Sequence, residues 1–281
     1  PASDPSSSDS PSACRCACAS RSRSGRTDPG PPPADVEKRL IARWYDESSP
    51  HTHPFHSYAA SHHVPSLMAI DLRNKPIAIT GASSGIGAAT ALACARAGMQ
   101  VALAARRIDK CQELADTINR EGGRAIAIAC DVTDPAACEA LTAKTVEAFG
   151  SIYSLYANAG YGFEATICDM SDAEMRAIFE TNFFGTLNAI RPAVARMKAA
   201  GSGHVLICSS CLGKLTIPYY GAYSATKAAQ VHIGRAMKLE LAPAGIHVST
   251  VHPIGTRTEF FDKVQASKAA VARGSGVARL V

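Results

Sequence analysis

Tyr223 and Lys227 stand four positions apart, and Ser210 precedes Tyr223 by thirteen residues. On a helix, residues i and i+4 face the same side, so the Lys227 ammonium can approach the phenol oxygen of Tyr223. A free tyrosine has a pKa of about 10, and a neighbouring positive charge makes proton release at neutral pH easier. A serine hydroxyl beside them can hold a substrate oxygen and stabilise its developing negative charge. These three side chains therefore predict proton transfer to and from an oxygen atom.

A glycine-rich turn lies upstream, in the segment Thr80-Gly81-Ala82-Ser83-Ser84-Gly85-Ile86-Gly87. It follows a short apolar segment and opens a helical one. Gly81 permits a tight turn, while Gly85 and Gly87 let backbone N–H groups at a helix N-terminus approach a pyrophosphate. Because this is the first strand-to-helix turn of a longer series, its position favours a dinucleotide site over a purely structural turn.

The elements that must position these residues alternate along the chain from Lys75 onward. The expected strands are Pro76 to Thr80, Gln100 to Ala104, Arg124 to Cys130, Ser154 to Ala157, His204 to Ser209 and His247 to Val251. The expected helices are Ile86 to Ala97, Asp109 to Glu121, Pro135 to Phe149, Asp172 to Ala199 and Tyr223 to Leu241. Strands that are apolar throughout are typical of a parallel sheet covered on both faces. The predicted fold class is therefore α/β, a doubly wound, parallel, Rossmann-type sheet in a single domain.

From about residue 72 to residue 261 these motifs resemble the short-chain dehydrogenase/reductase family, whose nucleotide motif reads TGxxxGxG. The resemblance implies that Tyr223 donates a proton in carbonyl reduction and accepts one in the reverse direction. It gives Lys227 two roles, lowering the Tyr223 pKa and binding the nicotinamide ribose. Asn182 matches the family asparagine that helps to carry a proton relay through water. The implied activity is hydride transfer between nicotinamide and a carbonyl or alcohol substrate.

Three further segments match the family's cofactor contacts. Asp131-Val132 resembles the pair that contacts adenine, and Asn158-Ala159-Gly160 resembles NNAG, with Ala157 replacing its first asparagine. The third segment resembles PGxxxT, which holds the nicotinamide carboxamide, with Ile254 where its glycine is expected. The cofactor-binding residues implied by the resemblance are Gly81, Ser83, Ser84, Gly85, Ile86, Gly87, Arg106, Arg107, Asp131, Val132, Asn158, Ala159, Gly160, Tyr223, Lys227, Pro253, Gly255 and Thr258.

The end of the second strand favours NADP over NAD. Ala105 stands where a carboxylate would bind the adenosine ribose hydroxyls, and Arg106 and Arg107 follow it. Guanidinium groups bind a 2′-phosphate bidentately and stay charged. We therefore expect Arg106 first, and Arg107 second, to contact the NADP phosphate.

Residues 1–67 form a separate block rich in Pro, Ser, Arg and His, which we expect to be a disordered extension. Met68 directly precedes the α/β pattern, so we expect the natural start there and assign 68–281 to the folded domain. Family members usually continue through a seventh strand. This sequence stops about 30 residues after Val251, and we expect it to end before that strand.

Composition narrows the range of partners. The net charge of +5 lacks the dense basic stripe of a nucleic-acid-binding protein, and no apolar run reaches the ~18 residues needed to span a bilayer. Of the ten cysteines, three crowd the segment 14–18 and seven are scattered through apolar segments, which favours reduced thiols in a cytoplasmic protein. Neither the cysteines nor the histidines have the paired spacing of a zinc site, so we expect no metal. By resemblance, the two long helices are expected to pair between subunits of a homodimer or homotetramer.

Alternatives stay open for three features. The segment Cys208-Ser209-Ser210-Cys211 contains a CxxC motif, which could indicate redox chemistry. The whole fold could be a non-catalytic nucleotide-binding or interaction protein, and the arginines of residues 21–26 could bind RNA. Tyr219, Tyr220, Phe260 and Phe261 favour an apolar substrate pocket with aromatic walls, although the sequence does not identify the substrate.

Overall fold

A computed structural model of the chain describes residues 70–256 and 258–260. The expected disordered block of residues 1–67, with its three cysteines and five histidines, lies outside the described residues. So do Phe261 and the segment that follows it.

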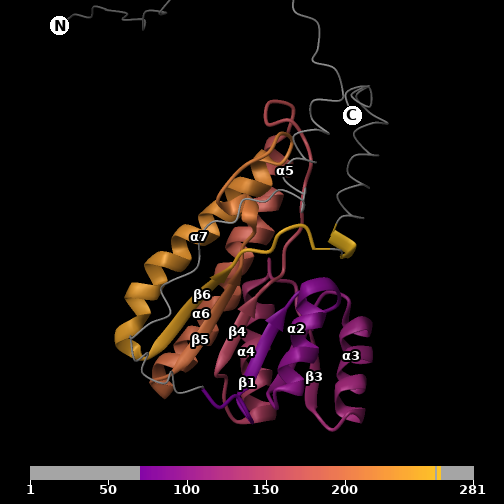
Figure 1. Cartoon of the computed structure of the whole chain (residues 1–281), viewed down its shortest axis with the longest axis vertical. Helices are drawn as coiled ribbons and strands as arrows, with labels where there is room; N and C mark the ends of the chain where they lie inside the picture. Colours follow the sequence, from indigo (N-terminus) through magenta and orange to yellow (C-terminus); the bar gives the residue numbers. More distant parts are fainter. Residues whose placement is uncertain (1–69, 257, 261–281) are drawn as a thin grey trace, which may run out of the picture. The chain divides into compact units, whose positions relative to one another are not determined.

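In the described part of the chain, six parallel strands form one sheet in the order β3-β2-β1-β4-β5-β6 (Figure 1). Their bounds are Pro76–Thr80 for β1, Gln100–Ala105 for β2, Arg124–Ala129 for β3, Ser154–Ala157 for β4, Gly203–Cys208 for β5 and Ile246–Val251 for β6. Every expected strand is present, and its ends differ from the expected ones by no more than one residue. β1, β2 and β4 are buried along their whole length, as central strands of a covered parallel sheet must be.

Helices cover both faces of this sheet. The main helices are α2 (Gly85–Arg96), α3 (Ile108–Arg120), α4 (Pro135–Phe149), α5 (Asp172–Phe179), α6 (Gly185–Ala200) and α7 (Gly221–Leu241). Alternate residues of β1 and β2 belong to two different apolar clusters, because successive side chains of a strand point to opposite faces. One cluster lies under α2 and α3, and the other lies under α4 and α6 and reaches the end of α7. This confirms the doubly wound, Rossmann-type sheet predicted from the sequence.

The single helix expected from Asp172 to Ala199 is wrong in one respect. A π-helical turn, Glu180–Phe184, separates α5 from α6. The carbonyl oxygen of Asn182 accepts hydrogen bonds from Gln230 Nε2 at 2.6 Å and from Thr186 Oγ1 at 2.7 Å. Gln230 lies on α7, so a tertiary contact accompanies the widened turn. The spacing of apolar residues along the helix does not indicate this π-helical turn.

The strand order creates the cleft in which a ligand is expected. The chain runs outward from β1 to β3, then returns across the sheet to β4, so β1 and β4 are neighbours whose crossovers diverge. In open α/β sheets, ligands bind at the carboxyl ends of the strands at such a switch point. The glycine-rich turn follows β1 and the segment 158–160 follows β4, so both lie at this point.

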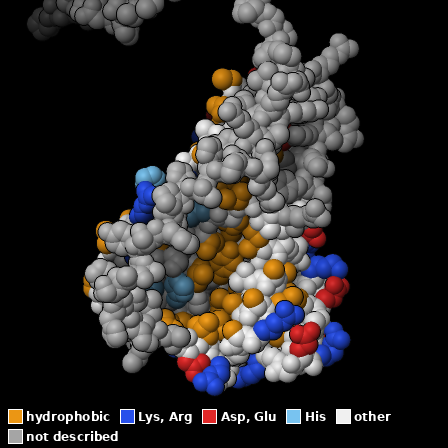
Figure 2. All heavy atoms as spheres, viewed as in Figure 1, with side chains coloured by type: hydrophobic (Ala, Val, Ile, Leu, Met, Phe, Trp, Pro, Cys, Tyr) orange, Lys and Arg blue, Asp and Glu red, His pale blue; other side chains and the backbone are white. Residues whose placement is uncertain are grey.

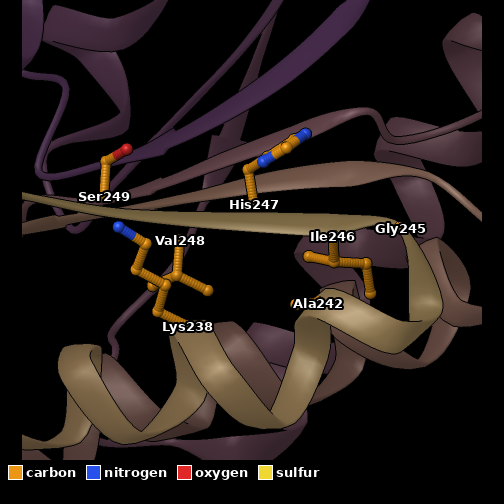
Figure 3. A pocket seen from close by; sticks show the side chains of 7 residues that line it. All are labelled: Lys238, Ala242, Gly245, Ile246, His247, Val248 and Ser249. Carbon is orange, nitrogen blue, oxygen red and sulfur yellow. The ribbon is translucent and has the colours of Figure 1, made fainter.

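The far side of the sheet ends at β6. Ile246 and Val248 are buried on the α7 face of this strand, while His247 and Ser249 point to the opposite face (Figure 3). A hollow of about 270 Å³ lies beside this edge, near the start of β6, away from the switch point. Figure 2 shows apolar side chains exposed over the middle of the sheet and charged side chains gathered over α3.

None of the helices within residues 70–256 and 258–260 combines the length and the apolar character that crossing a bilayer requires.

Candidate active site

The glycine-rich turn joins β1 to α2, and its Gly81 and Gly87 have no room for side chains because they lie against Asn158 and Ala159, which follow β4. Gly81 and Gly85 have φ values of +66° and +56°, in the left-handed region that favours glycine. A Cβ atom on Gly87 would overlap the carbonyl oxygen of Gly81 and lie 2.7 Å from Asn158 Nδ2. Ile86 packs against the apolar cluster under α2. Bare backbone at the start of a helix suits the close approach of an anion.

The two arginines that follow β2 make different contacts. Arg107 donates from Nη2 to Ser83 Oγ at 3.1 Å and to Ser84 Oγ at 2.9 Å, so it lies on the glycine-rich turn. The side chain of Arg106 is 75% exposed, and its Nη1 lies 4.0 Å from Asp131 Oδ2. Both guanidinium groups therefore lie at the carboxyl end of β2, with Arg107 held in place and Arg106 extended into solvent.

Asp131 and Val132 form the turn after β3. Asp131 Oδ1 accepts hydrogen bonds from the backbone nitrogen of Thr133 at 3.0 Å and from its hydroxyl at 2.8 Å. The backbone bond is the main reason why the pKa of Asp131 is lowered. Val132 is buried, and its carbonyl oxygen accepts a hydrogen bond from Asn188 Nδ2 at 3.0 Å. The carboxylate therefore stays charged on a rigid turn at the edge of the cleft.

The segment Asn158-Ala159-Gly160 is bonded directly to the end of β1. The hydroxyl of Thr80 accepts from the backbone nitrogens of Asn158 at 3.0 Å and Ala159 at 3.1 Å. In return, Asn158 Nδ2 donates to the carbonyl oxygens of Thr80 at 3.0 Å and Gly81 at 3.3 Å. Thr80 is thus a central residue of the cleft to which the sequence analysis assigned no role. The signals available in the sequence were its position in an otherwise apolar strand and its place as the first residue of the TGxxxGxG motif.

Tyr223, Lys227 and Ser210 lie together at the carboxyl end of β5. Tyr223 is 7% exposed and lies beside Ser210, whose hydroxyl accepts a hydrogen bond from Leu212 N at 3.1 Å. Lys227 Nζ lies 5.6 Å from the centroid of the Tyr223 ring and donates to the carbonyl oxygen of Cys208 at 2.8 Å. The expected arrangement of phenol, amine and hydroxyl is therefore present in space, on α7 and on the turn after β5.

Burial shifts the pKa values of both Tyr223 and Lys227. Burial raises the pKa of Tyr223 to about 12, and the neighbouring Ser210 hydroxyl acts in the opposite direction. Burial also lowers the pKa of Lys227 to about 8. The lowering of the Tyr223 pKa by Lys227 and bound oxidised nicotinamide stays a prediction. In the protein alone, removal of the phenol from water is the largest effect, and it raises this pKa. Tyr223 is therefore protonated at neutral pH and able to donate a proton.

Asn182 is fully buried, and its side chain is bonded to two neighbours. Its Oδ1 accepts from Tyr161 N at 3.0 Å, and its Nδ2 donates to Tyr161 O at 2.9 Å and to Thr226 Oγ1 at 3.2 Å. The structure thus places Asn182 against the loop after β4 and against α7. Its contact on α7 is Thr226, which directly precedes Lys227. A Cβ atom on Gly160 would lie 3.0 Å from Asn182 Oδ1 and 3.6 Å from Lys227 Nζ, so Gly160 keeps this corner open. Thr226 and Gln230, which bond to Asn182, were not singled out by the sequence motifs.

The segment after β6 returns to both sides of the cleft. The carbonyl oxygen of Pro253 accepts from Cys211 N at 3.0 Å, next to Ser210. A Cβ atom on Gly85 would lie 3.1 Å from Thr258 Cβ, so Thr258 packs on the glycine-rich turn. Between them, Gly255 is exposed and has a φ value of +30°. Glu259 Oε2 lies 2.9 Å from Arg107 Nη2, which gives the turn a second contact with this segment.

Aromatic rings surround the phenol of Tyr223. The ring of Tyr220 lies 6.5 Å from it and that of Phe260 lies 5.5 Å from it, between centroids. Tyr161 and Phe163 pack against the same small apolar cluster. Of the aromatic residues expected to line the substrate site, Tyr220 and Phe260 therefore contact Tyr223. Tyr219 has a φ of +68°, and Phe261 lies outside the described residues.

The cysteines of the CxxC motif carry free thiols. Cys208 is buried at the end of β5, and Cys211 is partly buried. The motif therefore brackets Ser210 instead of opening a helix after an early strand, which is the position of a thioredoxin-like motif.

Comparison with known proteins agrees with this geometry. A family model described as short chain dehydrogenase matches residues 75–269. An uncharacterized oxidoreductase of Listeria monocytogenes is 33% identical over 195 residues, which cover 69% of this chain and 79% of that protein. Glycine betaine reductase ATRR of Emericella nidulans is 37% identical over 188 residues. This match covers 67% of this chain. It covers only 15% of the relative, which is much longer.

Solved structures show the same fold. A short-chain type dehydrogenase/reductase from Mycobacterium marinum is 36% identical and superposes with a TM-score of 0.67, covering 72% of this chain and 81% of that one. A short chain dehydrogenase/reductase from Burkholderia phymatum, solved in complex with NAD, is 28% identical with the same TM-score, covering 72% of this chain and 73% of that one. The matched segment contains the glycine-rich turn, the serine, the tyrosine and the lysine. The chain therefore belongs to the short-chain dehydrogenase/reductase family of oxidoreductases.

Proposed function

We propose that this protein is an NADP(H)-dependent oxidoreductase that transfers a hydride between nicotinamide and a carbonyl or alcohol substrate. The observation that carries the proposal is the meeting of Ser210, Tyr223 and Lys227 at the carboxyl end of the sheet. They lie beside a glycine-rich turn that admits no side chains at Gly87. A non-catalytic nucleotide-binding protein would have no need for this trio.

The residues at the switch point fit a dinucleotide. The α2 N-terminus can hold the pyrophosphate, Asp131 and Val132 the adenine, and Lys227 the nicotinamide ribose. Arg106 and Arg107 supply two guanidinium groups where an NAD-specific site would present a carboxylate, and this supports NADP. Bound nicotinamide supplies the hydride in reduction and accepts it in oxidation.

The protein's own groups then handle the proton. Ser210 is oriented by its bond from Leu212 N and can hold the substrate oxygen next to Tyr223. Tyr223, protonated at neutral pH, donates its proton to that oxygen as negative charge develops. The ammonium group of Lys227 stabilises the phenolate that remains. In alcohol oxidation, the same phenol oxygen accepts the proton.

Replacement of Tyr223 by phenylalanine tests the acid/base role. We expect kcat for carbonyl reduction to fall by about 10²- to 10⁴-fold, because the proton donor is removed while the ring stays. NADPH binding, measured by fluorescence titration of the cofactor, should change far less. NADPH consumption by the Tyr223→Phe variant at the native rate would refute the assignment. If the native protein binds NADPH and consumes none with any ketone or aldehyde, it is a binding protein.

Replacement of Arg106 by aspartate tests the cofactor preference. We expect KM for NADPH to rise far more than KM for NADH, because the new carboxylate repels the 2′-phosphate and can accept the ribose hydroxyls instead. Lys144→Asp, which makes the same charge change on an exposed position of α4, is the control. Equal changes in the two KM values would contradict the NADP assignment.

Two further predictions from the sequence concern the whole protein. We propose a homodimer or homotetramer, to be tested by light scattering coupled to size-exclusion chromatography, and a cytoplasmic location, to be tested by fractionation of the source cells. We also propose that residues 68–281 suffice for folding. An insoluble or unfolded 68–281 fragment would contradict that boundary.

A further inference from the structure

Gln230, on α7, carries a buried amide to which the catalytic motifs assign no role. The residue is fully buried, and its Nε2 donates to the carbonyl oxygen of Asn182 at 2.6 Å and to Thr186 Oγ1 at 2.8 Å. These two bonds use both protons of the amide nitrogen. Its Oε1 is also buried, and it has no hydrogen-bond partner among the described residues.

Stability alone does not explain a glutamine at this position. A buried acceptor without a partner makes the native state less stable. An apolar side chain of similar length, such as methionine, would fill the same space without that loss. Rotation of the amide by half a turn offers no remedy, because it would set Oε1 against the carbonyl oxygen of Asn182, and both atoms are acceptors. The reason for the glutamine therefore lies in what its nitrogen holds.

The nitrogen of Gln230 holds the π-helical turn between α5 and α6. The backbone nitrogen of Gly185 donates to the carbonyl oxygen of Glu180, five positions back, so this turn is one residue wider than an α-helical one. α7 packs against the turn and against α5 (Figure 1). π-helical turns are rare and occur frequently at functional sites. A bond from a separate helix thus fixes the widened turn in which Asn182 lies.

Asn182 connects this turn to the reaction site. Its Oδ1 accepts from Tyr161 N at 3.0 Å, which fixes the loop after β4. Its Nδ2 donates to Thr226 Oγ1 at 3.2 Å, and the same hydroxyl donates to Tyr223 O at 2.7 Å. The carboxamide therefore lies between the loop after β4 and the part of α7 that carries the proton donor. A displacement of about 1 Å near a reaction site can lower the rate by about 10²-fold.

We propose that Gln230 is a positioning residue for the reaction at Tyr223. By holding the Asn182 carbonyl, it keeps the Asn182 carboxamide in the place where this group joins the loop after β4 to α7. The inference rests on the proposed function, and it adds a fully buried residue that acts through Asn182.

Replacement of Gln230 by methionine tests the proposal, because it keeps the length of the side chain and removes both bonds. The substrate is the ketone or aldehyde that the native protein reduces fastest in a panel with NADPH. We expect kcat to fall about tenfold to 100-fold, while Kd for NADPH in a fluorescence titration changes by less than about threefold. The midpoint of urea unfolding should stay near the native value, because the variant loses the unpartnered acceptor together with the two bonds.

Gln100→Met is the matched control. Gln100 is also a buried glutamine whose Oε1 has no partner among the described residues, but it begins β2, at the amino ends of the strands and away from the cleft. This control should leave kcat at its native value. The proposal is overturned if Gln230→Met also leaves kcat unchanged. It is equally overturned if kcat, NADPH affinity and the unfolding midpoint all fall together, because that result indicates a merely structural role.

Gln230→Glu restores one of the two bonds in a pH-dependent way. The protonated carboxyl group can donate to the carbonyl oxygen of Asn182, whereas the ionised group has no proton to donate. Relative to the native protein at the same pH, kcat of this variant should be highest at about pH 5 and fall as the carboxyl group ionises. The comparison at equal pH removes the contribution of Lys227. A ratio that stays constant from about pH 5 to about pH 9 would contradict the role of this bond.

Hydrogen exchange of the Tyr161 amide gives a measurement that does not require turnover. In the full chain, this amide should exchange at least about tenfold faster in Gln230→Met than in the native protein or in Gln100→Met, because its bond to Asn182 Oδ1 opens more often. Native turnover with an unchanged kcat in Gln230→Met would overturn this inference and leave the proposed activity intact. Faster exchange in a protein that reduces no carbonyl compound would support the coupling to Asn182 and count against the activity. Unchanged exchange would overturn the coupling.

Discussion

Lys227 is predicted to make the fold less stable at neutral pH than it would be with an apolar side chain. Its amine is fully buried, and burial lowers its pKa from 10.5 to about 8. At about 1.4 kcal/mol for each pKa unit, keeping the buried ammonium protonated below pH 8 costs about 3 kcal/mol of folding free energy. Lys227→Met removes this cost. It also removes the bond to the Cys208 carbonyl, which is worth about 1 kcal/mol.

The direction of the pH dependence follows from the proton count. Between pH 8 and pH 10.5 the folded protein has released the Lys227 proton while the unfolded chain still holds it, so this group makes the native protein more stable as pH rises. From pH 7 to pH 10 the gain is about 2.5 kcal/mol. The variant lacks it. The stability of Lys227→Met relative to the native protein should therefore be highest at pH 7 and fall by about that amount at pH 10.

Urea unfolding at a series of pH values measures this difference. Circular dichroism is the suitable probe, because it reports directly on the helices and strands of the described part of the chain. Lys144→Met, on the exposed side of α4, controls for the loss of one positive charge. A stability difference between Lys227→Met and the native protein that stays constant from pH 7 to pH 10 would refute the reasoning. So would a variant that is less stable than the native protein at pH 7.

Three other changes test the cleft. Gly87→Ala places a Cβ atom against the carbonyl oxygen of Gly81, so NADPH affinity should fall at least about tenfold in a fluorescence titration, and an unchanged Kd would contradict the packing. Thr80→Val leaves two backbone N–H groups at the end of β4 without their acceptor, which should cost about 2 kcal/mol in urea unfolding; a loss below about 0.5 kcal/mol would show that these bonds do not stabilise the cleft. In the native enzyme, kcat/KM for carbonyl reduction should fall as pH rises through about 8, because Lys227 loses its charge there. A flat profile between pH 7 and pH 9.5 would argue against the role of the ammonium group.

Local patterns were sufficient to predict most of the fold. Strands such as Gln100–Ala105 are apolar after their first residue, and some of the following helices have a start signal, such as Asp134 and Pro135 at α4. These signals act within a few residues, so they can be read without knowledge of the tertiary structure. The π-helical turn at Asn182 could not be predicted, because its carbonyl is held by Gln230, 48 positions further along the chain.

The spacing of Ser210, Tyr223 and Lys227, and of the glycines from Gly81 to Gly87, was readable from the amino-acid sequence alone. Spacing along one helix or one turn determines which side chains share a face. Other features depended on residues that are distant in the chain and neighbours in space. The bonds from Thr80 to the end of β4, the upward shift of the Tyr223 pKa and the burial of Glu164 beside Tyr220 are of this kind. Exclusion of water and contact between separate strands set these properties, and both exist only after the sheet has assembled.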